Sequence, residues 1–121
     1  MKNKILICIL ISTLILISSC SHEAKEKIKE VNVYKPEGSG SMLPLIQPNS
    51  KIYAIGNSSN INTGDIIIFR SCENDLIVHR IYSMLKIQEK IYYITKGDFN
   101  KVIDNCLISN EMIEGKVIRI E

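Results

Sequence analysis

Five short runs rich in isoleucine, valine and tyrosine, each bounded by turn-forming residues, most constrain the fold of this chain. Glycine, asparagine, aspartate or serine lies between most of these runs, and Gln88-Glu89-Lys90 separates the third from the fourth. Branched and aromatic side chains in such runs favour strands, and no stretch between them suits a dominant helix. We therefore predict a mainly β domain, a small antiparallel barrel or sheet. The predicted strands are Lys51–Ile55, Asp65–Arg70, Leu76–Ile87, Ile91–Thr95 and Lys116–Ile120.

Two of the connections are expected to be tight turns. Glu73-Asn74-Asp75 would join the second run to the third, and Gln88-Glu89-Lys90 the third to the fourth. The third run, LIVHRIYSMLKI, does not alternate strictly, so a helix competes there, but its Ile, Val and Tyr content favours a strand. His79 would then lie in the middle of a rigid strand.

Composition indicates one small domain without a nucleic-acid partner. The chain has 121 residues, of which 45% are apolar, and a net charge of +2. This length suits a single core. Fifteen basic and thirteen acidic residues are interspersed without a block of like charge. Such a pattern is typical of a mixed, solvated surface rather than a nucleic-acid-binding one.

The first twenty residues resemble an export signal. Lys2 and Lys4 precede an uncharged, largely apolar run of thirteen residues, Ile5–Ile17. A spanning helix needs about 18 or more residues, so a cleaved signal is favoured over a permanent anchor. Ile17-Ser18-Ser19-Cys20 resembles a bacterial lipobox, in which the cysteine carries a lipid and becomes the first mature residue. An uncleaved signal-anchor is the alternative, because Ser18 and Ser19 would lengthen the segment enough for a thinned bilayer.

The segment after this signal is expected to be a tether. Residues 21–37 alternate charges and contain few large apolar residues, with one helical turn expected after Ser21. We divide the chain into a signal segment with the lipobox (1–20), a charged tether (21–37) and one folded domain (38–121). On either view of the signal, residues 21–121 would be membrane-anchored and extracytoplasmic.

The four cysteines differ in position. Cys8 lies inside the apolar run and is expected to act as a small hydrophobic residue. Cys20 is the expected lipidation site. Cys72 and Cys106 would meet an oxidising compartment, where a disulfide between them is an open alternative. Neither has the spacing of a metal ligand, so we expect no metal site.

Three short strings carry residues suited to catalysis: GSGSM at 38–42, IVHR at 77–80 and GDFNKVID at 97–104. Ser41 lies in a glycine-flanked turn, with a stiff apolar exit at Met42-Leu43-Pro44. Alone, such a serine is usually only part of a flexible turn, and a lone histidine among apolar residues is usually a core residue. Together, Ser41, His79 and Asp104 supply the nucleophile, base and carboxylate of an activated-serine site.

The loop at 97–104 superficially resembles a calcium loop. An EF-hand starting at Asp98 needs glycine at its sixth position and glutamate at its twelfth, where this chain has Ile103 and Ser109. Calcium is therefore disfavoured. Gly97-Asp98 is expected to form a turn in which the Asp98 side chain caps nearby backbone amides, leaving Asp104 available for another role.

These strings and two others, in this order, resemble the type I signal peptidase family, in particular its endoplasmic-reticulum-type branch. The family's serine box S-G-S-M-x-P is matched by Ser39–Pro44, and its G-D/E-x-V-V-F strand by Gly64–Phe69. The branch has His-Arg where bacterial housekeeping enzymes have Lys-Arg, as at His79-Arg80. Its T-K-G-D-N-N-x-V-D-D box is matched by Thr95–Asp104, and its closing G-K/R-V strand by Gly115–Val117.

The resemblance implies a serine endopeptidase that removes signal or leader peptides from exported precursors at the membrane, without a cofactor. Ser41 would be the nucleophile, His79 the base and Asp104 the group that orients it. The oxyanion hole would comprise the Ser41 backbone N–H and the Ser39 hydroxyl. Substrates would have small residues before the cleavage site and would bind as an extended strand. The resemblance also implies structural roles near the site for Gly40, Met42, Pro44, Arg80, Gly97 and Asp98.

The chain also departs from the family pattern. Leu43 replaces a common acidic residue, Asn49-Ser50 replaces a Gly-Asp pair, and Ile103 replaces the first of two aspartates. A lipobox is unusual where the family keeps a spanning helix. A related self-cleaving repressor would need a DNA-binding domain and a serine-lysine site, so it is disfavoured. The alternative from another class is a non-catalytic surface lipoprotein whose β domain binds a partner.

Overall fold

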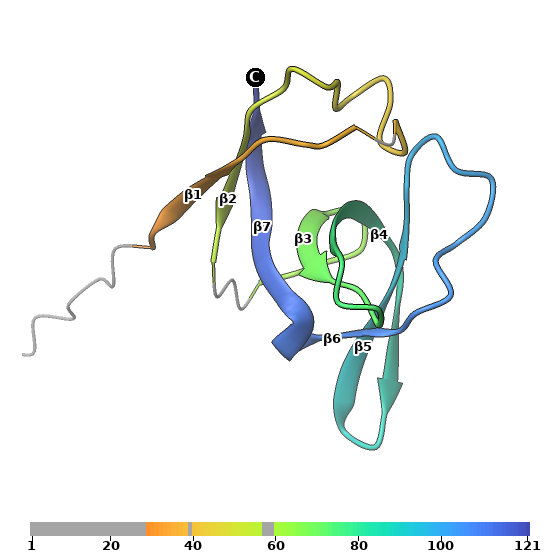
Figure 1. The fold of residues 1–121 in the computed structure, drawn as a ribbon. Coiled ribbons are helices and arrows are strands. Elements are labelled where there is room, and N and C mark those ends of the chain that lie inside the picture. Colours follow the sequence, from red (N-terminus) through yellow and green to blue (C-terminus); the bar gives the residue numbers. More distant parts are fainter. Residues whose placement is uncertain (1–28, 39, 57–59) are drawn as a thin grey trace, which may run out of the picture.

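The computed structural model describes residues 29–38, 40–56 and 60–121, which contain one seven-stranded antiparallel sheet. Its strands are β1 (Val31–Tyr34), β2 (Ile52–Ile55), β3 (Ile66–Arg70), β4 (Leu76–Ile87), β5 (Lys90–Lys96), β6 (Ile108–Ser109) and β7 (Ile113–Ile120). A single 3₁₀ turn in this part of the chain, η1 (Asn110–Met112), precedes β7. The strand order is β1-β2-β7-β3-β4-β5-β6. Figure 1 shows β1, β2 and β7 together and the β4–β5 hairpin extending away from them.

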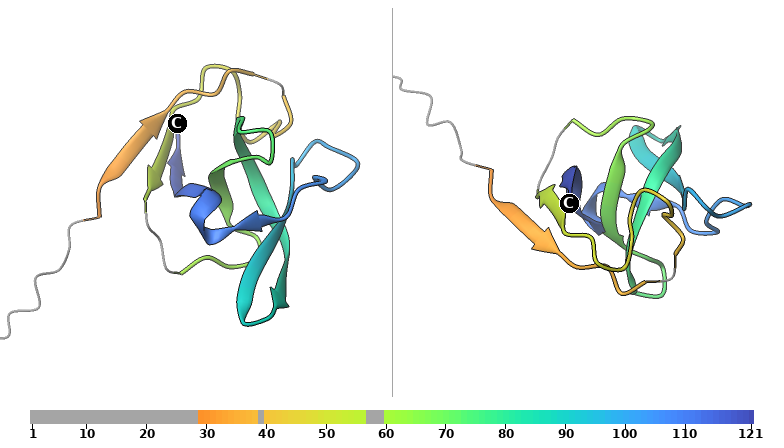
Figure 2. Two further views of the ribbon diagram at one scale, coloured as in Figure 1. Left: turned by 60° about the horizontal axis from the view of Figure 1, so that its bottom comes forward. Right: turned by 90° about the horizontal axis from the view of Figure 1, so that it is seen from above.

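The sheet is open. β1 and β6 are its edges, and within the described ranges they do not pair with each other. β1 has four residues and β6 only two. Such short strands provide too few backbone hydrogen bonds to close the sheet. The two views in Figure 2 show that β1 and β6 lie apart. The prediction of a mainly β, antiparallel domain is confirmed, as a sheet rather than a closed barrel.

All five predicted strands are present, as β2, β3, β4, β5 and β7, with small shifts at their ends. β1 and β6 are additional. β1 lies in the segment expected to be a tether, and it pairs along β2 from Val31↔Ile55 to Tyr34↔Ile52. Its first three residues are exposed, so it carries little of the apolar signal that marks the other strands.

Both predicted tight turns are observed. Asn74, in the β3–β4 connection, has a φ of 68°. Gln88 and Glu89, which join β4 to β5, have φ values of 47° and 65°. Two consecutive residues with positive φ give the hairpin turn whose twist matches that of the flanking strands. The turn sets the long β4–β5 register, which begins at Ile87↔Lys90.

β3 lies at the centre of the core and is buried on both faces. Ile67 and Phe69 belong to one apolar cluster, which also contains Ile81, Tyr93 and Ile108. Ile66 and Ile68 belong to a second cluster on the other face. This alternation explains why the strand reads as a continuous run of isoleucines. The second cluster also contains Met42 and Ile46, so the core reaches directly to the segment that carries Ser41.

Candidate active site

The serine turn is fixed by backbone hydrogen bonds and by apolar burial. The amide of Leu43 donates to Gly40 O at 3.1 Å, and the amide of Ile46 donates to Met42 O at 3.0 Å. Gly40 has a φ of 72°, a conformation that favours glycine. Met42 is 4% exposed and packs in the second cluster. Ser41 is therefore attached to the hydrophobic core through the residue that follows it.

The loop at 97–100 contacts the backbone of Ser41. The Phe99 amide donates to Ser41 O at 2.9 Å, and a Cβ added to Gly97 would lie 2.6 Å from the same oxygen. Gly97 is needed because any side chain there would push this backbone away. The Asn100 amide also donates to Gly97 O at 3.0 Å, which confirms the predicted turn.

His79 lies on β4, opposite Ile67 of β3, and is 7% exposed. Its ring packs edge-on against Phe69 with 6.4 Å between the ring centroids. Nε2 is 3.0 Å from the Ser41 Oγ, and Nδ1 is 2.6 Å from the Asp104 Oδ2. With Nδ1–H donating to the carboxylate, Nε2 is free to accept the serine proton. The three side chains thus form one hydrogen-bonded chain.

Asp104 is held in place by Thr95, to which the sequence assigned no role. The Thr95 hydroxyl donates to Asp104 Oδ2 at 2.7 Å, and the Asp104 amide donates to Thr95 O at 2.8 Å. Thr95 is fully buried on β5, beside Ile81 of β4. Two sequence signals pointed to Thr95: its inward position on a predicted strand and its place at the start of the matched Thr95–Asp104 box. One carboxylate oxygen therefore accepts two hydrogen bonds, which fixes the orientation of the group.

The role predicted for the Asp98 side chain is wrong. Its carboxylate accepts from Arg80 Nε at 2.9 Å and from Nη2 at 2.7 Å, rather than capping backbone amides. A paired guanidinium is a stronger partner than a neutral amide. This hydrogen-bonded guanidinium lowers the pKa of Asp98, and Asp98 raises the pKa of Arg80. Arg80 also donates to Gly64 O at 2.8 Å, so it fastens the loop and a turn to β4.

A cleft of about 500 Å³ lies beside Ser41 and His79. Pro36–Gly38 and Asp75–Val78, the latter at the start of β4, are among the segments that line it. β4 pairs with β5 only from Arg80 onward. The edge of Leu76–Val78 that faces away from β3 thus has no strand partner among the described residues.

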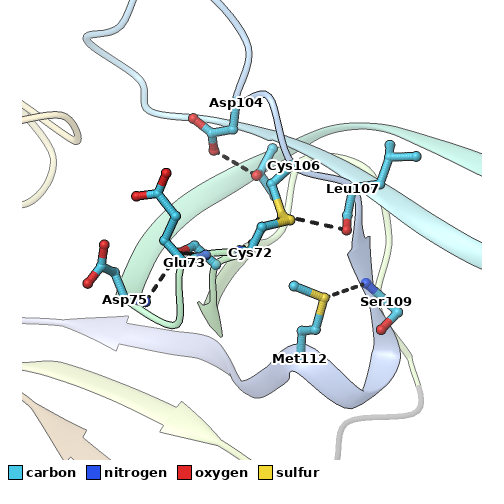
Figure 3. The surroundings of a disulfide bond; sticks show 10 residues. Cys72, Glu73, Asp75, Asp104, Cys106, Leu107, Ser109 and Met112 are labelled. Atoms are coloured by element: carbon cyan, nitrogen blue, oxygen red, sulfur yellow. Dashed lines mark hydrogen bonds between the residues drawn. A yellow bond between two sulfur atoms is a disulfide. The ribbon is translucent and has the colours of Figure 1, made fainter.

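Cys72 and Cys106 form a disulfide, with 6.0 Å between their Cα atoms. Cys72 is in the β3–β4 turn, and Cys106 is two residues beyond Asp104. Figure 3 shows Asp104 next to this bridge. The sequence left the pairing open.

Some predictions concern residues outside the described ranges: the signal segment 1–20 with Cys20, the helical turn after Ser21, and Ser39. Pro44 is described and lies exposed at the end of the serine turn. Between residues 29 and 121, apart from the undescribed positions 39 and 57–59, no helix has the length and apolar character to cross a bilayer.

Comparison with known proteins gives one informative similarity. The chain is 29% identical to signal peptidase I W of Bacillus subtilis (strain 168) over 110 residues, which cover 89% of this chain and 57% of that protein. The chain thus spans little more than half the length of this relative. No family model and no solved structure matches. The similarity supports a signal peptidase I-like protein, without distinguishing the branch.

Proposed function

We propose that this protein is a serine endopeptidase that removes signal or leader peptides from exported precursors. The hydrogen-bonded chain from Ser41 Oγ through the His79 ring to Asp104 carries the proposal. Similarity to a signal peptidase supports the choice of substrate class. His79-Arg80 favours the endoplasmic-reticulum-type branch, because a housekeeping bacterial enzyme has lysine in place of this histidine.

The proposed reaction is acyl transfer to Ser41. His79 Nε2 takes the proton from Ser41 Oγ as this oxygen attacks the scissile carbonyl. Asp104 stabilises the imidazolium, which then gives its proton to the leaving amine. Water, activated by the same histidine, hydrolyses the acyl-enzyme and restores Ser41.

The negative charge on the attacked oxygen would be stabilised by the Ser41 backbone N–H and the Ser39 hydroxyl. Loss of one such donor typically costs ~10²–10³ in rate. The assignment of Ser39 comes from the serine box alone.

The substrate would bind in the cleft as an extended strand. The open edge of Leu76–Val78 is suited to main-chain hydrogen bonds with a peptide, and it leads toward His79 on the same strand. A peptide paired there would pass Ser41.

We further propose anchoring at the membrane through lipidated Cys20 or an uncleaved segment, with the site extracytoplasmic. The lack of any insertion between the matched boxes favours a dedicated substrate over general preproteins.

Cleavage of a precursor by the purified full chain tests the proposal. Ser41→Ala should abolish cleavage, because the hydroxyl that forms the acyl-enzyme is gone, and His79→Ala should be nearly as severe. Ser83→Ala on β4 is the matched control and should cleave at the parental rate. If folded Ser41→Ala still cleaves at the parental rate, Ser41 is not the nucleophile and the proposed serine mechanism fails. If the folded parent does not cleave, the partner-binding lipoprotein replaces the peptidase proposal.

A further inference from the structure

We propose that the Cys72–Cys106 disulfide is a positioning element for Asp104, so that the cleavage rate depends on this bridge being oxidised. The inference rests on the proposed peptidase function and assigns a role in that reaction to two residues that take no part in its chemistry.

Asp104 lies in a long connection with little apolar burial of its own. Residues 97–107 join β5 to β6, and Phe99 and Val102 in this connection are 71% and 73% exposed. A segment with few buried apolar contacts opens at low free-energy cost. The position of Asp104 therefore depends on a few specific attachments rather than on packing of the loop.

Those attachments lie on both sides of Asp104. Before it, Asp98 is bound to Arg80, and the Phe99 amide is bound to Ser41 O. After it, Cys106 is 8% exposed, packs in the first core cluster and is covalently bound to Cys72. The Cys72 amide also donates to Cys106 Sγ at 3.1 Å. The bridge is thus the covalent attachment of the loop on the C-terminal side of the carboxylate.

The bridge also ties the carboxylate to the strand that carries the base. The ring it closes runs from Cys72 to Cys106 and includes His79, Thr95 and Asp104, whereas Ser41 lies outside it. Figure 3 shows the bridge, the β3–β4 turn and Asp104 gathered in one small region. A shift of Cys106 away from β4 would therefore act directly on the 2.6 Å contact between Asp104 and His79.

Opening the bridge should lower the rate without abolishing it. Two hydrogen bonds to Thr95 would still hold Asp104. Without the covalent bond, however, these hydrogen bonds alone would have to offset the conformational entropy that the loop loses when it is ordered. Displacement of a catalytic group by about 1 Å costs up to ~10²-fold in rate, so we expect a loss of roughly tenfold in kcat. KM should change little, since neither cysteine lines the cleft.

A double-mutant cycle separates this role from general stabilisation. The four proteins are the parent, Cys72→Ser with Cys106→Ser, Asp104→Asn, and the triple variant, assayed well below the lowest melting temperature. If the bridge acts through Asp104, its removal costs about tenfold in the parent and less than twofold in Asp104→Asn. An equal loss in both backgrounds, or no loss in the parent background, overturns the inference.

Two further measurements test the inference even if the cysteine variant folds poorly or the parent does not cleave. Dithiothreitol supplies two electrons and two protons, which convert the bridge to two thiols; it should lower the parental kcat reversibly and leave Asp104→Asn unchanged. The NMR signal of the His79 Nδ1 proton should broaden on reduction as its bond to Asp104 loosens. An unchanged signal contradicts the inference even without an activity assay, whereas an inactive parent with a responsive signal contradicts only the peptidase proposal.

Discussion

The serine turn and the loop that carries Asp104 reach the same site but are held there by different forces. The serine turn is attached by Met42 and Ile46, which are buried in the core beside β2 and β3. The loop has an exposed tip and is attached by Arg80, Thr95 and a disulfide. Ser41 is thus positioned largely by apolar packing of its turn, with backbone hydrogen bonds in support, and Asp104 by directional and covalent contacts. Substitutions of comparable size should therefore have very different effects in the two regions.

The largest effect is expected from Met42→Ala. Removing a buried side chain of this size leaves a cavity and typically costs ~2–5 kcal/mol in the free energy of unfolding. The variant should also have a lower kcat. The Met42 Sδ accepts a hydrogen bond from the Asp98 amide at 3.4 Å, so the loss of this side chain also loosens the contact between the serine turn and the loop that carries Asp104. Val102→Ala, in the exposed loop tip, should change stability by no more than ~0.5 kcal/mol. Denaturant unfolding of both variants measures the two changes in the free energy of unfolding. Equal losses of stability would refute the contrast between the two regions.

Gly97→Ala should have the next largest effect, mainly on rate. The new Cβ would lie 2.6 Å from Ser41 O, at the point where the two regions meet. The displaced serine backbone should lower kcat by ~10–100-fold. Gly56→Ala is the matched control, because the nearest atom to its Cβ would be 3.5 Å away. Parental kinetics for Gly97→Ala would show that this contact does not position Ser41.

The smallest effect is expected from Asp98→Asn. Arg80 lowers the pKa of Asp98 from its ordinary value of 3.8, so this ion pair stabilises the fold above that pH. The stabilisation is lost as pH falls through the lowered pKa. At neutral pH the variant should melt about 4–8 °C below the parent, as for a loss of ~1 kcal/mol.

Melting curves from pH 7 to about pH 2.5 test the mechanism. The difference in melting temperature between the parent and Asp98→Asn should decrease toward the acid end of this range. A gap that is constant with pH would mean that charge is not the cause. Cleavage by Asp98→Asn below its melting temperature should stay close to parental, because Thr95 and the disulfide, which lie nearer to Asp104 in the chain or contact it directly, still hold it.

Local patterns were sufficient to predict most of the sheet. β2, β3, β4, β5 and β7 each carry enough Ile, Val and Tyr to be found without a partner strand. β6 has only two residues, and β1 presents exposed side chains at a sheet edge, so their existence depends on partners that are distant in sequence. Closure of the sheet is likewise a property of the whole molecule.

Within the site, too, the residues marked by local sequence could be predicted, whereas the contacts between distant residues could not. Ser41, His79 and Asp104 were found because each lies in a distinctive string. The contacts of Thr95 and Asp98 were not, because each joins a strand residue to the loop that follows β5, and the path of that loop depends on the whole fold. The disulfide required the β3–β4 turn to lie beside residue 106, which spacing along the chain does not encode.

The open edge of β4 also bears on self-association. An unpaired strand edge is a template on which a second copy of the chain can add a strand and begin to aggregate. Here the stretch without a strand partner among the described residues is short, Leu76–Val78, and the charged Asp75, which also lines the cleft, precedes it. Brevity and a flanking charge are two of the devices that natural sheets use against such pairing. This edge is thus available to the extended peptide that we propose as substrate, while it offers a poor surface for polymerisation of the protein itself.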